Sequence, residues 1–100
     1  MSKAILITPL GERKEITPQN GTDFQLDEIY SHLSYDGPEV NTFELVHLHD
    51  GRYMLIDEEG KLKKEPVINP IATAFYLQGR SYYSDMIVGN VIICDSNMVL

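Results

Sequence analysis

The feature that most constrains the fold is a tight-turn signal between two apolar runs. Asp50-Gly51 separates the run over 43–48 from the run over 53–56. Asp-Gly is a frequent pair in hairpin turns, and the residue types on either side favour strands. The sequence therefore predicts a β-hairpin in the middle of the chain.

Other apolar runs predict further strands. Residues 3–8 are β-branched and apolar and indicate a first strand, which Pro9-Leu10-Gly11 ends. Residues 13–17 could return beside it as a short edge strand. The run over 86–93 predicts a buried strand, with an irregularity at Gly89-Asn90 where a bulge or a close backbone approach is expected.

The first helix is predicted from a capping motif and the spacing of apolar residues. Thr22 and Gln25 fit a capping box, in which two side chains satisfy free backbone N–H groups at a helix start. Apolar side chains then recur at the spacing of one helical face: Leu26, Ile29, Tyr30 and Leu33. We therefore predict a helix over about 22–34, which Asp36-Gly37-Pro38 ends.

A second, shorter helix is predicted over 70–77. Pro70 suits the first helical position, Asn69 suits the N-cap, and Gly79 follows the end. The elements thus run strand, short strand, helix, hairpin, short helix, strand. At one hundred residues the chain is a single domain over 1–100. We predict an α+β fold: a small, mostly antiparallel sheet with two helices packed on it.

The acidic residues are concentrated in one segment. The chain has 15 Asp and Glu against 8 Lys and Arg, a net charge of −7. No Lys or Arg stands between Lys14 and Arg52, where eight acids fall. Such a segment is either a solvated face or an acidic docking surface for a basic partner. The docking hypothesis assigns partner binding to these acids: Asp27, Glu28, Asp36, Glu39 and Glu44.

Composition excludes several classes of protein. One cysteine, Cys94, builds no disulfide framework, and its apolar surroundings predict an inert buried thiol. The negative charge disfavours a protein that grips nucleic acid, and eight acids are too sparse to imitate a duplex. The apolar start of the chain is too short for a signal peptide, and no stretch approaches the roughly 20 apolar residues of a membrane span. We expect a cytoplasmic protein that binds neither membrane nor duplex DNA.

Candidate catalytic groups are few. His47 and His49 would share one face of a strand and could meet one metal ion. Because no further ligand supports them, we interpret them as hairpin-surface histidines and expect no metal. Asp57, Glu58 and Glu59 are consecutive, so they point to different sides and form no acid–base pair. The sequence therefore predicts a non-enzymatic protein without a cofactor.

The second half of the chain carries a recognisable pattern. It reads Asp57-Glu58-Glu59-Gly60-Lys61-Leu62, then Asn69-Pro70-Ile71-Ala72, then Asp85-Met86-Ile87-Val88-Gly89-Asn90. Over about residues 50–95 the chain resembles a small phage- and plasmid-borne domain family of unknown function. Its members look like accessory proteins of mobile elements, often found near antirestriction proteins of the ArdA type. The resemblance implies a mobile-element origin and a role against host defence.

The residues of the pattern also have structural explanations. Gly60 could supply a positive φ in a turn, and Asp57 could accept hydrogen bonds from turn amides. Asn69 would cap the second helix. Ala72 and Ala74 would allow that helix to pack closely on the sheet.

The alternative explanation is a ligand pocket where the start of the second helix meets the loops at Gly60 and Asp85. A helix N-terminus offers free N–H groups to an anion, and a basic cluster that includes Lys61 could contact phosphates. The loop at Arg80–Ser84 adds two tyrosines, which suit protein interfaces or base stacking. The pocket hypothesis assigns ligand binding to these residues: Asn69, Lys61, Lys63, Arg80, Tyr82, Tyr83 and Asp85.

The sequence therefore leaves three functional hypotheses. The leading hypothesis is a phage or mobile-element accessory protein that inhibits a host defence factor by binding it. The first alternative is a small-ligand binder that sequesters a signalling nucleotide, and the second is a metal-dependent enzyme at His47 and His49. A domain of this kind could also form a homo-oligomer through the edge of the last strand or through residues 97–100.

Overall fold

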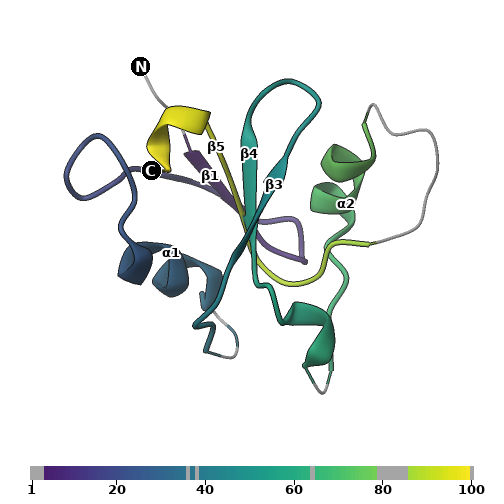
Figure 1. The fold of residues 1–100 in the computed structure, drawn as a ribbon. Coiled ribbons are helices and arrows are strands. Elements are labelled where there is room, and N and C mark those ends of the chain that lie inside the picture. Colours follow the sequence, from purple (N-terminus) through teal and green to yellow (C-terminus); the bar gives the residue numbers. More distant parts are fainter. Residues whose placement is uncertain (1–3, 36, 38, 64, 79–85, 100) are drawn as a thin grey trace.

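The computed structural model describes residues 4–35, 37, 39–63, 65–78 and 86–99. These residues form a five-stranded antiparallel sheet and two α-helices (Figure 1). In chain order the elements are β1 (Ala4–Ile7), β2 (Arg13–Ile16), α1 (Leu26–Leu33), β3 (Glu44–His47), β4 (Tyr53–Ile56), the 3-10 turn η1 (Gly60–Leu62), α2 (Pro70–Leu77), β5 (Val91–Cys94) and the 3-10 turn η2 (Ser96–Met98). The predicted α+β class and order of elements are confirmed. Neither α-helix in the described ranges is long and apolar enough to cross a membrane.

The last strand lies at the centre of the sheet, whose order is β2-β1-β5-β4-β3. All four residues of β5 are buried, which explains why the run is apolar throughout rather than alternating. The strand begins only at Val91, because Gly89 has a φ of +76° and breaks the predicted run, as the expected irregularity implied. The idea that the edge of the last strand joins two copies is wrong, since β1 and β4 pair with both of its edges.

The two helices cover opposite faces of the sheet (Figure 1). Successive residues of a strand point to opposite faces. Leu6 and Ile92 therefore pack in one cluster with Ile29 of α1, whereas Ile7 packs in the other with Ala72 of α2. The two faces of the sheet therefore support two separate cores.

Helix α1 begins later than predicted. Its N-cap is Gln25, whose backbone N–H donates to Glu28 Oε2 at 2.9 Å. The capping box is therefore formed by Gln25 and Glu28 and not by Thr22 and Gln25. Thr22 belongs instead to the preceding turn, where its N–H donates to Asn20 Oδ1 at 2.9 Å. The sequence holds two overlapping capping motifs, and the second is the one that forms.

Helix α2 begins as predicted. Asn69 is its N-cap and accepts a hydrogen bond from the N–H of Ala72 at 3.0 Å, and Pro70 is the first helical residue. Ala72 is fully buried against the sheet. Ala74 is exposed, so the prediction that it also packs on the sheet is wrong.

The central hairpin is confirmed. β3 pairs with β4 in antiparallel register, with Leu45 opposite Leu55. Gly51 has a φ of +91°, a backbone conformation that is strained for residues with a side chain. The N–H of Leu48 donates to the carbonyl of Arg52 at 2.9 Å and closes the turn.

Candidate functional site

A cleft of about 790 Å³ opens at the end of the sheet where β1 and β4 finish and β5 begins. Volumes of roughly 300–1,000 Å³ are typical of ligand-binding pockets. Five segments line the cleft: the β1–β2 turn (8–12), the end of α1 and the loop after it (33, 35, 37 and 40), the turn after β4 (57, 60 and 63), residues 65–67, and the approach to β5 (88–90). Because these segments come from distant parts of the chain, the cleft is a product of the tertiary fold.

The rim of the cleft exposes apolar side chains. Leu10, at the β1–β2 turn, is 94% exposed, and Val67 is 56% exposed. Buried apolar residues, Leu33 and Val40, complete the wall beneath. Exposed apolar groups gathered at a concave surface are typical of a binding site.

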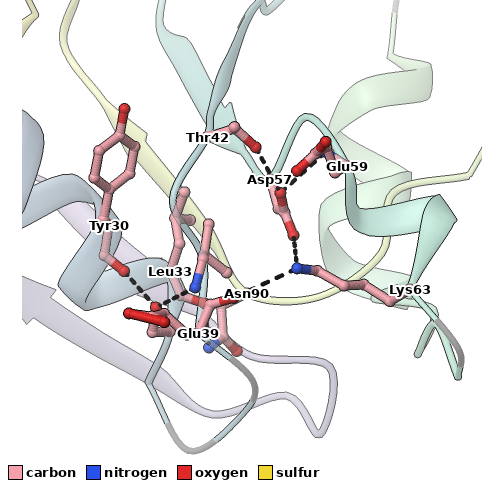
Figure 2. Close-up of polar contacts among 10 residues, drawn as sticks. Tyr30, Leu33, Glu39, Thr42, Asp57, Glu59, Lys63 and Asn90 are labelled. Carbon is pink, nitrogen blue, oxygen red and sulfur yellow. Dashed lines mark hydrogen bonds and ion pairs between the residues drawn. The ribbon is translucent and has the colours of Figure 1, made fainter.

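One wall of the cleft carries the carboxylate of Asp57 (Figure 2). Its side chain is nearly buried, at 8% exposed. Its Oδ1 accepts hydrogen bonds from Thr42 Oγ1 at 3.2 Å and from the N–H of Glu59 at 3.0 Å. The prediction that Asp57 binds turn amides is therefore confirmed. These bonds fix the carboxylate in one orientation.

Lys63 joins two walls of the cleft (Figure 2). Its Nζ lies 3.6 Å from Asp57 Oδ2 and donates to the backbone carbonyl of Glu39 at 3.4 Å. Strong charge-assisted N–H···O bonds are about 2.7–2.9 Å long. Lys63 is thus held loosely, and its side chain remains 34% exposed.

Asn90 ties the end of α1 to the start of β5. Its Nδ2 donates to the carbonyls of Leu33 and Tyr35, at 3.1 Å and 2.6 Å. The last carbonyls of a helix lack partners within the helix, and Asn90, just before β5, supplies one. This role could not be predicted, because nothing near Asn90 in the chain indicates which helix end it meets.

Gly60 is needed for space rather than for its backbone conformation. The glycines with positive φ among the described residues are Gly11, Gly21, Gly51 and Gly89, so the predicted positive φ of Gly60 is wrong. A Cβ at Gly60 would lie 2.8 Å from Val88 Cγ2, which is closer than real Cβ atoms approach. Gly60 therefore lets the turn after β4 pack directly on the approach to β5.

The residues of the sequence pattern divide between the cleft and the core. Asp57, Gly60 and residues 88–90 line the cleft. Asn69 is fully buried; besides capping α2, its Nδ2 donates to the carbonyls of Ile7 and Gly89 at 3.1 Å and 2.9 Å. Asn69 thus holds the end of β1 against α2, and its polar groups are engaged within the fold.

Among the described residues of the pocket hypothesis, Lys61 does not line the cleft that contains Lys63. Lys61 is exposed on η1 and lines a smaller pocket of about 130 Å³ together with Glu44 and Tyr76. Four predicted ligand-binding residues lie outside the described residues: Arg80, Tyr82, Tyr83 and Asp85.

The acids assigned to partner binding have different environments. Glu28 is buried, and its Oε1 accepts from the N–H of Gln19 at 2.7 Å while its Oε2 serves the cap of α1. Asp27, Glu39 and Glu44 are exposed, and Asp36 lies outside the described residues. Glu28 therefore stabilises the start of α1, whereas three of the acids remain accessible.

The histidine pair does not lie on one strand. β3 ends at His47, whose ring packs edge-on against the ring of Tyr53, with 5.0 Å between the ring centroids. His49 is exposed and lies in the turn after β3. Among the described residues, no group of three or more His, Cys, Asp or Glu side chains could hold a metal ion. Cys94 is buried, and burial raises the pKa of its thiol to about 11, which agrees with the predicted inert thiol.

Comparison of the chain with protein-family models, curated proteins and solved structures gives no match. The cleft and its residues are therefore the basis for a functional assignment.

Proposed function

We propose that the protein is a non-enzymatic binding protein of phage or mobile-element origin that inhibits a host defence factor. It does so by holding an extended apolar segment of that factor in the cleft. The origin and the class of target rest on the resemblance over residues 50–95. The mode of action rests on the cleft, which is the observation that carries the proposal.

Two properties of the cleft favour a protein segment. Its volume of about 790 Å³ lies in the upper part of the roughly 300–1,000 Å³ typical of ligand pockets. Its rim exposes Leu10 and Val67, which could contact apolar side chains of a partner outside the cleft as well as within it. Both features suit a peptide segment that lies in the cleft and extends beyond its rim.

The alternative of a signalling nucleotide has less support. Among the described lining residues, three are acids, Glu12, Asp57 and Glu65, and one is a base, Lys63. Phosphate groups would meet an excess of negative charge there. The alternative of a metal-dependent enzyme lacks a supporting geometry, because His49 lies beyond the end of β3.

Backbone-amide NMR during titration with short extended peptides tests the proposal. The peptides carry apolar side chains at alternate positions, and cyclic and linear nucleotides form a parallel series. We expect peptide-induced shifts at Gly11, Val67 and Gly89, which line the cleft, and none at Gly51 in the distant hairpin turn. The proposal fails if no peptide causes shifts at about 1 mM, or if only nucleotides do.

A further inference from the structure

We infer that the segment held in the cleft carries a lysine or arginine side chain, and that Asp57 is the receptor for its positive charge. This inference rests on the proposed function and specifies the chemistry of the partner. The carboxylate, its burial and the loosely held Lys63 carry it together.

The charges of the cleft favour a cation. Glu12 and Glu65 are exposed on the described lining, Asp57 lies deeper, and Lys63 is the single described base among them. A concave surface with an excess of one sign attracts the opposite charge. A cationic segment is therefore favoured over a neutral or an acidic one.

Asp57 is the acid placed to make a specific contact. Its side chain is 8% exposed, so water screens its charge weakly. Oδ1 is engaged by Thr42 and Glu59, whereas the contact described for Oδ2 is the ammonium of Lys63 at 3.6 Å. A carboxylate oxygen accepts more than one hydrogen bond, so Oδ2 retains capacity for a donor from a ligand.

Lys63 is an internal occupant of this position. It stands where a partner's cation would stand, and its contacts of 3.6 Å to Asp57 and 3.4 Å to the carbonyl of Glu39 are longer than strong bonds of their kind. Its ammonium is able to turn outward to water when another cation arrives. The exchange keeps Asp57 paired throughout, so no buried charge is left without a partner.

Three peptides that differ only in a central Lys, Gln or Glu test the inference by calorimetry. We expect the Lys peptide to bind about tenfold more tightly than the Gln peptide, and the Glu peptide to bind most weakly. The Asp57→Asn variant retains an oxygen for the bonds from Thr42 and Glu59. It should bind the Lys and Gln peptides equally.

A second variant, Lys63→Met, has the opposite expected effect. Removal of the competing ammonium should tighten binding of the Lys peptide about threefold or more and leave the Gln peptide unchanged. A loss of Lys-peptide affinity in Lys63→Met would overturn the inference, because it would show that the Lys63 ammonium helps to hold the peptide instead of competing with its cation.

The outcomes separate the two proposals. Equal binding of the Lys and Gln peptides to the wild-type protein overturns the inference and leaves the proposed function standing. Failure of all three peptides to bind overturns both. Thermal unfolding of each variant shows whether it is folded, and Lys63→Met tests the charge preference even if Asp57→Asn does not fold.

Discussion

Asn69 shows how much one buried amide contributes at the scale of single residues. Its oxygen caps α2, and its nitrogen donates to the carbonyls of Ile7 and Gly89. Only the cap could be predicted from the sequence, because Pro70 follows directly and the capped N–H group belongs to a residue three positions along the chain. The two bonds to the ends of β1 and of the approach to β5 depend on tertiary packing.

The Asn69→Ala variant should lose about 3 kcal/mol of unfolding free energy, because it removes the cap and leaves buried backbone groups without partners. Urea denaturation measures this loss. The matched variant is Asn41→Ala at an exposed position, where a change of about 0.5 kcal/mol or less is expected. Similar losses in the two variants would contradict the structural role of Asn69.

Cys94 should be unreactive in the folded protein. Burial raises the pKa of its thiol from 9.0 to about 11, and the nearby Asp95 carboxylate adds to the effect, so the thiolate is scarce at about pH 8. A disulfide reagent should therefore modify Cys94 rapidly in urea and very slowly without it. Equal rates would show that the thiol is accessible.

The same pKa has a consequence for stability. The folded state holds the thiol proton more tightly than the unfolded chain, so the protonated thiol contributes to the free energy of unfolding. This contribution is complete below about pH 9. It is lost as the pH rises toward 11. The difference in unfolding free energy between wild type and Cys94→Ala should narrow over that range.

At the scale of elements, Gly60 sets how closely the turn after β4 meets the approach to β5. The Gly60→Ala variant should lose about 1–3 kcal/mol, because its Cβ would lie 2.8 Å from Val88 Cγ2. The double variant with Val88→Ala should lose less than the sum of the two single variants.

Gly51→Ala provides the control for this pair. Nothing lies within 4 Å of a Cβ at Gly51, but its φ of +91° is strained for alanine, so a loss of about 1 kcal/mol is expected. Val88→Ala should leave that loss unchanged. If Val88→Ala relieved both alanine variants equally, the close approach at Gly60 would not be the cause.

The start of α1 depends on Glu28 and not on its neighbour Asp27. Glu28→Ala should lose about 1–2 kcal/mol, since the N–H groups of Gln19 and Gln25 lose their acceptor. Asp27→Ala, at an exposed position, should change stability by about 0.5 kcal/mol or less. Equal losses of stability in the two variants would contradict the role of Glu28 in stabilising the start of α1.

Elements with local determinants could be predicted, and those with competing or distant ones could not. The hairpin turn and the Asn69 cap each depend on a few adjacent residues. The start of α1 was misplaced because Thr22 and Gln25 both precede a suitable partner, and only packing selects between them. The central position of β5 was missed because strand order is decided by pairings across the whole chain.

At the scale of the whole molecule, the sheet has a helix on each face (Figure 1). The cleft lies at one end of the sheet. Its walls come from segments as distant as Thr8 and Asn90. The sequence identified Asp57, Gly60, Lys63 and Gly89 as residues of interest. It placed the pocket at the start of α2 instead, because no local signal shows that α1 and the β1–β2 turn approach the same end of the sheet.

The most direct test of the cleft as the binding site is a matched pair of substitutions on adjacent residues. Val67 lines the cleft and is 56% exposed, whereas Ile68 is 49% exposed and is not among the described lining residues. Calorimetry of the Lys peptide should show that Val67→Gln, which removes the apolar contact without adding a charge, weakens binding about tenfold or more, and that Ile68→Gln leaves it within about twofold. Equal effects of the two substitutions, or no effect of either, would contradict binding in the cleft.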